Sequence, residues 1–251
     1  MRISFLWALL LLTSAPSSMA IVERHDRDDG QYLKLGARFD AVGEVEPDGS
    51  GTLVASRWVL TAAHVAAGRG GATAVKFGER RYRVKRAVLH PLGTAARDRP
   101  PEVDLALLEL ETPVDGIAPL EIYRSHDEAG RTAFIVGWGD YGKGGTALTH
   151  TDHRRRAATN QVSDAGPRRL FFSFDAPPAG TDLEGVCGPG DSGGPALLES
   201  GGRVLVAGVS SAADGPPGNY GLTDIFVRVS AYADWIDKTI HASGAEPKAQ
   251  P

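Results

Sequence analysis

The chain of 251 residues carries 27 basic and 31 acidic side chains, which gives a formal net charge of −4 at pH 7. This balance provides no electrostatic case for nucleic acid or an anionic membrane surface as the main partner. The content of 42% hydrophobic and 23% charged residues is that of an ordinary globular protein, and it excludes a disordered or collagen-like chain.

Residues 1–20 are typical of a secretory signal peptide. Arg2 supplies a short positive region, residues 3–12 are almost all apolar, and Ala20 ends a stretch of small residues suited to cleavage. An apolar stretch of about ten residues is too short for a membrane anchor, which needs roughly 20. We therefore expect the mature protein to be secreted or periplasmic and free of the membrane.

Cys187 is the single cysteine of the chain, so no intramolecular disulfide can form even though secretion favours disulfides. Neither His nor Lys adjoins it in sequence. We therefore expect Cys187 to be a small buried hydrophobic residue rather than a nucleophile.

From residue 21 onward, short apolar runs separated by Gly, Pro, Asp and Asn predict an all-β barrel or sandwich. The predicted strands are 41–45, 51–55, 58–61, 74–77, 82–89, 105–110, 133–136, 169–174, 195–198, 204–210 and 225–229. Near the end of the chain, Ser230 is a candidate N-cap, and apolar residues at helical spacing predict one helix through residue 240. Pro119 interrupts the strand pattern and indicates a boundary near residues 117–125.

Three separate motifs point to acyl-transfer chemistry. Ser192 lies in the glycine-lined turn of residues 190–195, His64 ends a β-rich run, and Asp104 opens an apolar strand. A serine hydroxyl is a poor nucleophile at neutral pH, so it needs a base within hydrogen-bond reach and a third group that orients the base. A buried carboxylate at Asp104 would also have to be paired.

The chain order of these residues separates two folds. Gly190-x-Ser192-x-Gly194 also satisfies the nucleophile elbow of α/β-hydrolases, in which the acid and the histidine follow the serine. Here His64 and Asp104 both precede Ser192, by 128 and 88 residues, and the strand-helix alternation of that fold is absent.

Together the motifs resemble the trypsin/chymotrypsin family of serine endopeptidases, over nearly the whole chain from residue 21 to the terminal helix. The resemblance implies two six-stranded antiparallel β-barrels with the active site between them and a C-terminal α-helix. We expect the first barrel in residues 21–122, the second in 123–229, the helix in 230–241 and a disordered tail in 242–251. Animal members generally carry several disulfides, so the single cysteine suggests a bacterial-type member.

The resemblance also implies a role for each motif. Ser192 attacks the scissile carbonyl, His64 takes and returns the proton, and Asp104 orients His64, as in the Ser-His-Asp template. Gly190 and Ser192 supply the backbone N–H groups of the oxyanion hole. Ser210 is expected to support Asp104. No cofactor or metal is expected.

Activation is the second implication. Cleavage after Ala20 leaves Ile21 as the first residue, and in the family the new amino group pairs with the aspartate before the catalytic serine, which is Asp191 here. Glu23 and Arg24 depart from the family, which usually has two glycines at these positions.

The residue preference before the scissile bond stays open at this level. An ungapped count from Ser192 puts Val186 at the base of the specificity pocket, whereas alignment on the cysteine puts Gly185 there. The other wall is expected from Ser210, Ser211, Ala212 and Asp224. Asp224 could select Arg or Lys, could narrow the pocket together with Ala212 so that it admits small residues, or could point elsewhere.

Residues 154–156, with Arg168 and Arg169, form a basic cluster for which we expect a solvated loop rather than a site for an acidic partner. The sequence thus predicts a secreted, monomeric serine endopeptidase that acts on proteins or peptides. The alternative is a catalytically silent relative that binds proteins through its barrel surface.

Overall fold

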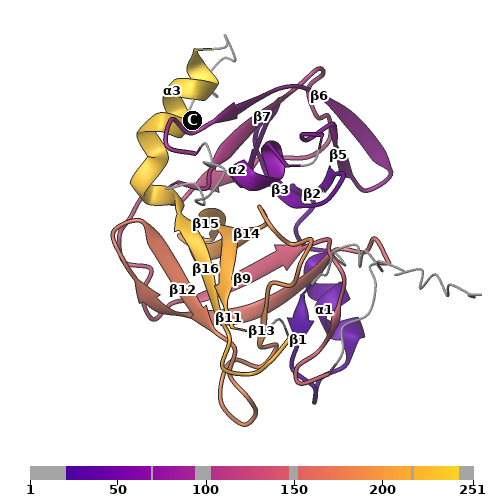
Figure 1. The fold of residues 1–251 in the computed structure, drawn as a ribbon, viewed down its shortest axis with the longest axis vertical. Coiled ribbons are helices and arrows are strands. Elements are labelled where there is room, and N and C mark those ends of the chain that lie inside the picture. Colours follow the sequence, from indigo (N-terminus) through magenta and orange to yellow (C-terminus); the bar gives the residue numbers. More distant parts are fainter. Residues whose placement is uncertain (1–20, 69, 94–102, 147–151, 216–217, 243–251) are drawn as a thin grey trace, which may run out of the picture.

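The computed structural model describes residues 21–242 apart from 69, 94–102, 147–151 and 216–217 (Figure 1). The predicted signal peptide and residues 243–251 of the predicted tail lie outside the described residues. The fold prediction is confirmed, because the chain forms two antiparallel barrels, each with a ring of six strands, followed by a C-terminal helix. The two barrels lie side by side (Figure 1).

The first barrel is closed, in the order β2-β3-β4-β7-β6-β5. Its strands are β2 (Val42–Glu46), β3 (Ser50–Ala55), β4 (Trp58–Thr61), β5 (Ala74–Phe77), β6 (Arg80–Leu89) and β7 (Ala106–Leu110). Strands β4 and β7 are buried along their whole length, which explains why their sequences are apolar runs rather than alternating patterns. A short helix, α2 (Ala63–Ala66), follows β4 directly.

The second barrel has the strand order β14-β9-β11-β12-β16-β15, and pairing of β14 with β15 closes the ring, while β8 extends it at β15. Its strands are β8 (Glu121–Ile122), β9 (Thr132–Gly137), β11 (Arg156–Ala165), β12 (Arg169–Ser173), β14 (Pro195–Ser200), β15 (Arg203–Asp214) and β16 (Thr223–Arg228). Strand β12 alternates between buried and more exposed residues along its whole length, and β9 and β16 do so over their first four residues, as expected for one face against a core.

The start of the described chain lies against the second barrel, although the sequence grouped it with the first. Strand β1 (Val22–Glu23) pairs with β10 (Gly142–Lys143) on one side and β13 (Gly185–Val186) on the other. Helix α1 (Asp29–Gly36) follows and packs on β11. The side chain of Asp28 caps α1 by accepting from the N–H of Gly30 at 2.8 Å.

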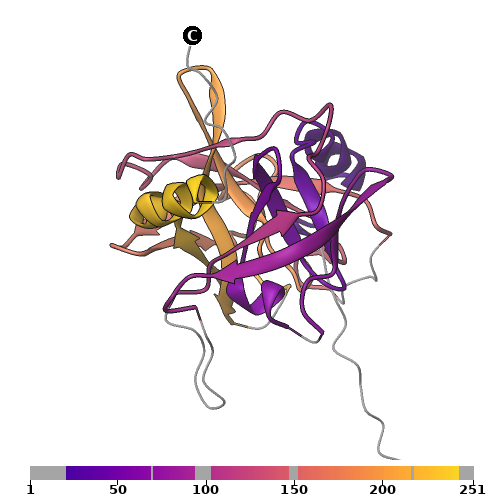
Figure 2. The same ribbon diagram turned by 90° about the horizontal axis from the view of Figure 1, so that it is seen from above.

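The C-terminal segment differs from its prediction in detail. It begins as a 3-10 turn, η1 (Val229–Tyr232), and continues as α3 (Ala233–His241). Ser230 does not cap α3, because its hydroxyl donates to Glu128 at 3.1 Å. Helix α3 lies at one side of the molecule in both views, with Ile236 buried in the larger core cluster (Figures 1 and 2). No helix in the described ranges is long and apolar enough to cross a membrane.

Strand β11 begins at the basic cluster, where the sequence predicted a loop, and the expectation of a solvated cluster is wrong for two of its arginines. Arg156 is fully buried and makes bidentate contacts with Asp29 and Asp152. Arg155 donates to the carbonyl of Gly36 at 2.8 Å. Asp29 and Gly36 lie far from these arginines along the chain, so a local charge pattern cannot reveal these contacts.

Candidate active site

His64 and Asp104 meet between the barrels as predicted from their motifs. His64 lies in α2 and Asp104 lies two residues before β7, which pairs with β4. Nδ1 of His64 lies 2.6 Å from Oδ2 of Asp104, and the backbone N–H of His64 donates to Oδ1 at 2.9 Å. The carboxylate therefore holds both the ring and the backbone of the histidine, and leaves Nε2 of the ring for another partner.

Asp104 is buried, yet it is held in the ionised form. Burial alone would raise the pKa of Asp104, but hydrogen bonds and charge from His64, together with a bond from Ser211, outweigh burial and place the pKa below its usual value. A carboxylate that stays ionised at neutral pH can stabilise a positive charge on His64.

Ser211, not Ser210, supports Asp104. The hydroxyl of Ser211 donates to Oδ2 of Asp104 at 2.7 Å. The side chain of Ser210 instead hydrogen-bonds with the thiol of Cys187. The register of β15 against β16 also shifts between residues 210 and 212, and a sequence pattern cannot show such a bulge.

The turn that carries Ser192 packs against the strand that leads to His64. The N–H of Ser50 donates to the carbonyl of Ser192 at 2.8 Å. Gly193 has a φ of +81°, and a Cβ on it would lie 2.1 Å from the hydroxyl oxygen of Thr61. Only glycine fits such a position. Thr61 is three residues before His64, so this contact brings the two motifs together.

No hydrogen bond joins the hydroxyl of Ser192 to His64 among the residues that the structure describes. Catalytic hydrogen bonds are often long without substrate and tighten in the complex. Gly190, the predicted oxyanion donor, has a φ of +93°, and its carbonyl accepts from the hydroxyl of Ser50 at 3.3 Å.

Asp191 is fully buried below this turn. Its carboxyl oxygens accept from the N–H groups of Gly139 at 3.2 Å and Gly188 at 3.0 Å. Burial nevertheless raises the pKa of Asp191 well above its usual value. The two backbone donors are therefore too weak to hold a charge here without a cation.

Ile21, the expected partner of Asp191, is fully buried next to Gly185 and directly precedes β1. The contacts described for the carboxyl group of Asp191 are those with the two backbone N–H groups, and none is with Ile21. The activation pair therefore stays a prediction.

The predicted pocket residues separate into two groups. Val186 is fully buried in an apolar cluster with Val22, Phe174 and Leu222, and Ala212 is exposed. In contrast, Asp224 is buried and faces Cys187, since its Oδ2 accepts from the N–H of Cys187 at 2.6 Å.

Cys187 forms the second group together with Asp224, although the sequence did not predict it as a pocket residue. Its thiol hydrogen-bonds with Asp224 and Ser210, and burial raises the pKa of the thiol well above its usual value. Burial likewise raises the pKa of Asp224 to about 7. The position of Cys187 between Val186 and Gly190 was the sequence signal for its place in this group.

The site offers no metal-binding set. Within the described part of the chain, no three His, Cys, Asp or Glu side chains come together in a way that could hold a metal ion.

Comparison with known proteins gives a consistent result. The family model described as Trypsin matches residues 37–236. The venom plasminogen activator of Agkistrodon piscivorus leucostoma is 29% identical over 248 residues, with 92% of each chain covered. Kallikrein-8 of Rattus norvegicus is 24% identical over 206 residues, with 76% of each chain covered.

A solved structure has the same fold. Neuropsin, described as a serine protease expressed in the limbic system of mouse brain, superposes with a TM-score of 0.67 at 19% identity, over 82% of this chain and 96% of its own. The family model spans most of the chain, including the motifs of His64, Asp104 and Ser192. The chain therefore belongs to the trypsin family of serine endopeptidases.

Proposed function

We propose that this endopeptidase hydrolyses peptide bonds through His64, Asp104 and Ser192, with an acyl-enzyme intermediate. The observation that carries the proposal is the 2.6 Å contact between Nδ1 of His64 and an aspartate held ionised by its donors. With the proton on Nδ1 of His64 donated in a hydrogen bond to Asp104, Nε2 is the nitrogen that can accept a proton.

In the proposed reaction, Nε2 of His64 takes the hydroxyl proton of Ser192 as the serine oxygen attacks the scissile carbonyl. Asp104 stays ionised and stabilises the positive ring. His64 then gives the proton to the leaving amine, which departs as the C–N bond breaks. Water repeats the sequence on the ester and frees Ser192.

The oxyanion of each tetrahedral intermediate is assigned to the N–H groups of Gly190 and Ser192. One such donor typically contributes about 3 kcal/mol to transition-state stabilisation. The left-handed backbone of Gly190 supports this assignment, because any other residue would be strained there.

We further infer that removal of residues 1–20 frees the amino group of Ile21 to pair with Asp191. The raised pKa of Asp191 supports this, since a buried acid of that kind gains most from a cation. N-terminal sequencing of the secreted protein tests the inference, and a fully active chain that begins far from Ile21 contradicts it.

For the residue preference, the geometry favours Arg or Lys before the scissile bond. Asp224 accepts from the N–H of Cys187, five residues before Ser192, which supports a place for its carboxyl group near the proposed pocket. A substrate cation would compensate this buried acid, whereas a small apolar side chain would leave it without a charge partner.

The proposed enzyme acts as a monomer on protein or peptide substrates outside the cytoplasm. A silent binding module is the competing reading, and it has no physical need for a histidine, an ionised aspartate and a glycine-lined serine in one place.

Labelling with a serine-reactive fluorophosphonate tests the proposal. We expect the mature wild type to label and Ser192→Ala not to label. Ser163→Ala is the matched control, because Ser163 lies exposed on β11 and binds only the carbonyl of Phe171 among its described contacts. Absence of labelling in folded wild type would favour the binding module.

A further inference from the structure

The segment after Ile21 buries charged side chains where members of the family usually have two glycines. Glu23 is fully buried and Arg24 is 4% exposed. Such burial is costly unless partners compensate the charge. The partners of these side chains therefore show what the segment holds together.

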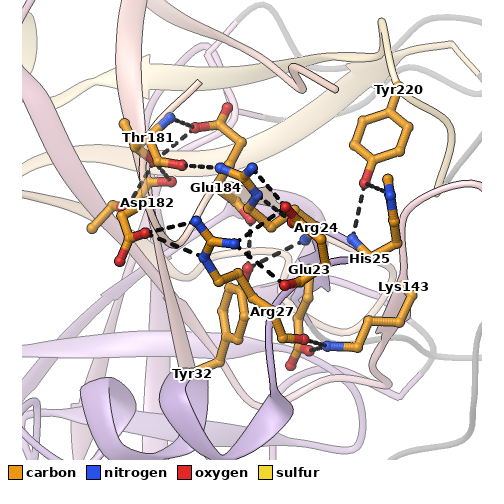
Figure 3. A network of polar contacts seen from close by, with 12 residues as sticks. Glu23, Arg24, His25, Arg27, Tyr32, Lys143, Thr181, Asp182, Glu184 and Tyr220 are labelled. Atoms are coloured by element: carbon orange, nitrogen blue, oxygen red, sulfur yellow. Dashed lines mark hydrogen bonds and ion pairs between the residues drawn. The ribbon is translucent and has the colours of Figure 1, made fainter. Parts of the chain in front are cut away.

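Arg24 and His25 join the segment to two stretches that border the predicted pocket (Figure 3). The N–H of Arg24 donates to the carbonyl of Glu184 at 3.1 Å, and its guanidinium donates to the carbonyl of Thr181 at 2.7 Å. The N–H of His25 donates to the hydroxyl of Tyr220 at 2.9 Å. Glu184 directly precedes β13, and Tyr220 lies three residues before β16.

Glu23 joins the same segment to β10. Its Oε2 accepts from Nζ of Lys143 at 2.5 Å, and the same Nζ donates to the carbonyl of Arg27 at 2.5 Å (Figure 3). Lys143 is four residues after Gly139, whose N–H donates to Asp191. The contact between Glu23 and Lys143 is thus linked, through residues 139–143, to Asp191, which precedes the proposed nucleophile.

The other oxygen of Glu23 lacks an ordinary partner. Oε1 is buried, has no hydrogen-bond partner among the described residues and lies 3.6 Å from Nε of Arg156. That Nε donates to Asp29 at 2.6 Å, and the carboxyl groups of Glu23 and Asp29 lie within hydrogen-bond reach of each other. Two carboxylates cannot bond to each other, but a proton on one makes it a donor.

The charges of the side chains around Glu23 cancel when Glu23 itself carries no charge. The titratable and charged groups that face it or its nearest partners are Lys143 on β10, Arg156 on β11, Asp29 and Tyr32 on α1, and Asp152 before β11. Farther out, Arg24 acts on Tyr32 and is paired with Asp26, and Arg156 acts on Asp191, whose pKa burial raises. Lys143 and Arg156 match Asp29 and Asp152, and burial raises the pKa of Tyr32 so that it stays neutral. An ionised Glu23 would add an uncompensated negative charge.

The titration of Glu23 agrees with this count. Burial, followed by the contact with Asp29, raises the pKa of Glu23 to about 8, although Lys143 acts in the opposite direction. The ordinary value is 4.5, so Glu23 is neutral at pH 7 and ionises in mildly alkaline solution.

We propose that Glu23 is a positioning residue for the proposed active site: its neutral carboxyl group holds the N-terminal segment between Lys143 of β10 and Asp29 of α1, and its ionisation drives the segment away from α1. On ionisation the proton leaves the carboxyl group for solvent, the contact with Asp29 becomes a repulsion, and the pair with Lys143 strengthens. Because Lys143 follows Glu23, the displaced segment shifts the stretch from Gly139 to Lys143, and with it the turn of Ser192. The inference rests on the proposed function.

Glu23→Gln in the mature protein tests this, because glutamine keeps the shape and a donor for Asp29 but cannot ionise. We expect kcat/KM at pH 7 to stay within about twofold of wild type. Between pH 7 and 10, the activity of wild type should fall with a midpoint near 8, and the variant should retain activity to a midpoint at least one pH unit higher. Equal alkaline midpoints would overturn the inference.

Two further variants separate positioning from general stability. Glu109→Gln is the matched control, because Glu109 is a buried glutamate paired with Lys85 and Arg86 in the first barrel, and it should not move the midpoint. Lys143→Met removes the cation that lowers the pKa of Glu23, so the alkaline midpoint should move upward while KM rises. A downward shift or no shift contradicts the proposal.

Thermal unfolding distinguishes failure of this inference from failure of the proposed function. The folded pKa of Glu23 is above the unfolded value, so wild type should lose thermal stability relative to Glu23→Gln as pH rises from about 5 to 8. If fluorophosphonate never labels wild type, the proposed function fails, and this comparison still decides the role of Glu23. Parallel unfolding curves would overturn it.

Discussion

Three aspartates are buried, one in the cleft and two inside the second barrel, yet their pKa values shift in opposite directions. The cleft residue is Asp104, and the other two are Asp191 and Asp224. The pKa of Asp104 is lowered, whereas burial raises the pKa of Asp191 and Asp224. Asp104 receives a donor that can become a cation, His64, and a hydroxyl from Ser211. The other two aspartates receive backbone N–H groups and a thiol. The comparison shows that burial keeps a buried acid protonated here unless its donors include one that can become a cation.

The largest expected effect concerns Asp104, the buried acid whose pKa is lowered. Asp104→Asn keeps the shape but cannot stabilise a charged His64, and in the Ser-His-Asp template the same change lowers kcat about 10,000-fold. We expect a loss of that order with KM little changed, measured on a peptide substrate. A loss below tenfold in a variant with normal thermal unfolding would contradict the role of Asp104.

Ser211 and Ser210 provide a matched pair with the next largest effect. Ser211→Ala removes a hydrogen bond to an ionised group, which typically stabilises by about 1.5 to 3 kcal/mol, so kcat/KM should fall roughly 10- to 100-fold. Ser210→Ala should leave the acid side of the pH profile unchanged, because Ser210 does not contact Asp104 in the described structure.

The sign of the pH effect follows from the depressed pKa of Asp104. Its ionised form contributes stability above the unfolded pKa of 3.8, and that contribution is lost as pH falls through the folded value. Loss of the Ser211 bond moves the folded value up, so acid unfolding of Ser211→Ala should begin at higher pH. Equal acid midpoints for the two serine variants would count against the assignment.

The smallest expected effect concerns Asp224, a buried acid whose pKa is raised. Because the pKa of Asp224 is about 7, preference for Arg over Ala before the scissile bond should rise up to about tenfold between pH 6 and 8. The ratio of the two kcat/KM values isolates Asp224, since any ionisation that affects both substrates equally cancels in the ratio. Asp224→Asn should flatten the ratio, and a flat ratio in wild type would favour the reading of a pocket for small residues.

Much of the fold and of the site followed from local patterns. Strands β4 and β5 begin and end at the predicted residues, because apolar runs bounded by turn residues mark buried strands. The motifs of His64 and Asp104 led directly to a pair in contact. Strand β11 was missed because its first residue, Arg156, is a charged side chain whose partners lie in α1 and the preceding turn.

The sequence assigned the support of Asp104 to Ser210 instead of its neighbour Ser211, and this error had a similar origin. The sequence contains Ser210 and Ser211 side by side, and the bulge in β15 decides which of them faces Asp104. A strand reverses its faces with each residue, so a shift of one residue exchanges the roles of neighbours.

The sequence by itself determined an all-β body with one C-terminal helix, because turn glycines and apolar runs are written locally. The order and wording of its motifs determined the family, and through that resemblance the two-barrel fold and the residues of the proposed triad. Only the tertiary structure decided which serine supports Asp104, that Cys187 and Asp224 face one another, and that Glu23 lies among Lys143, Arg156 and Asp29. Charge and proton affinity in a buried site depend on groups from distant segments, and their approach is set by packing rather than by any pattern along the chain.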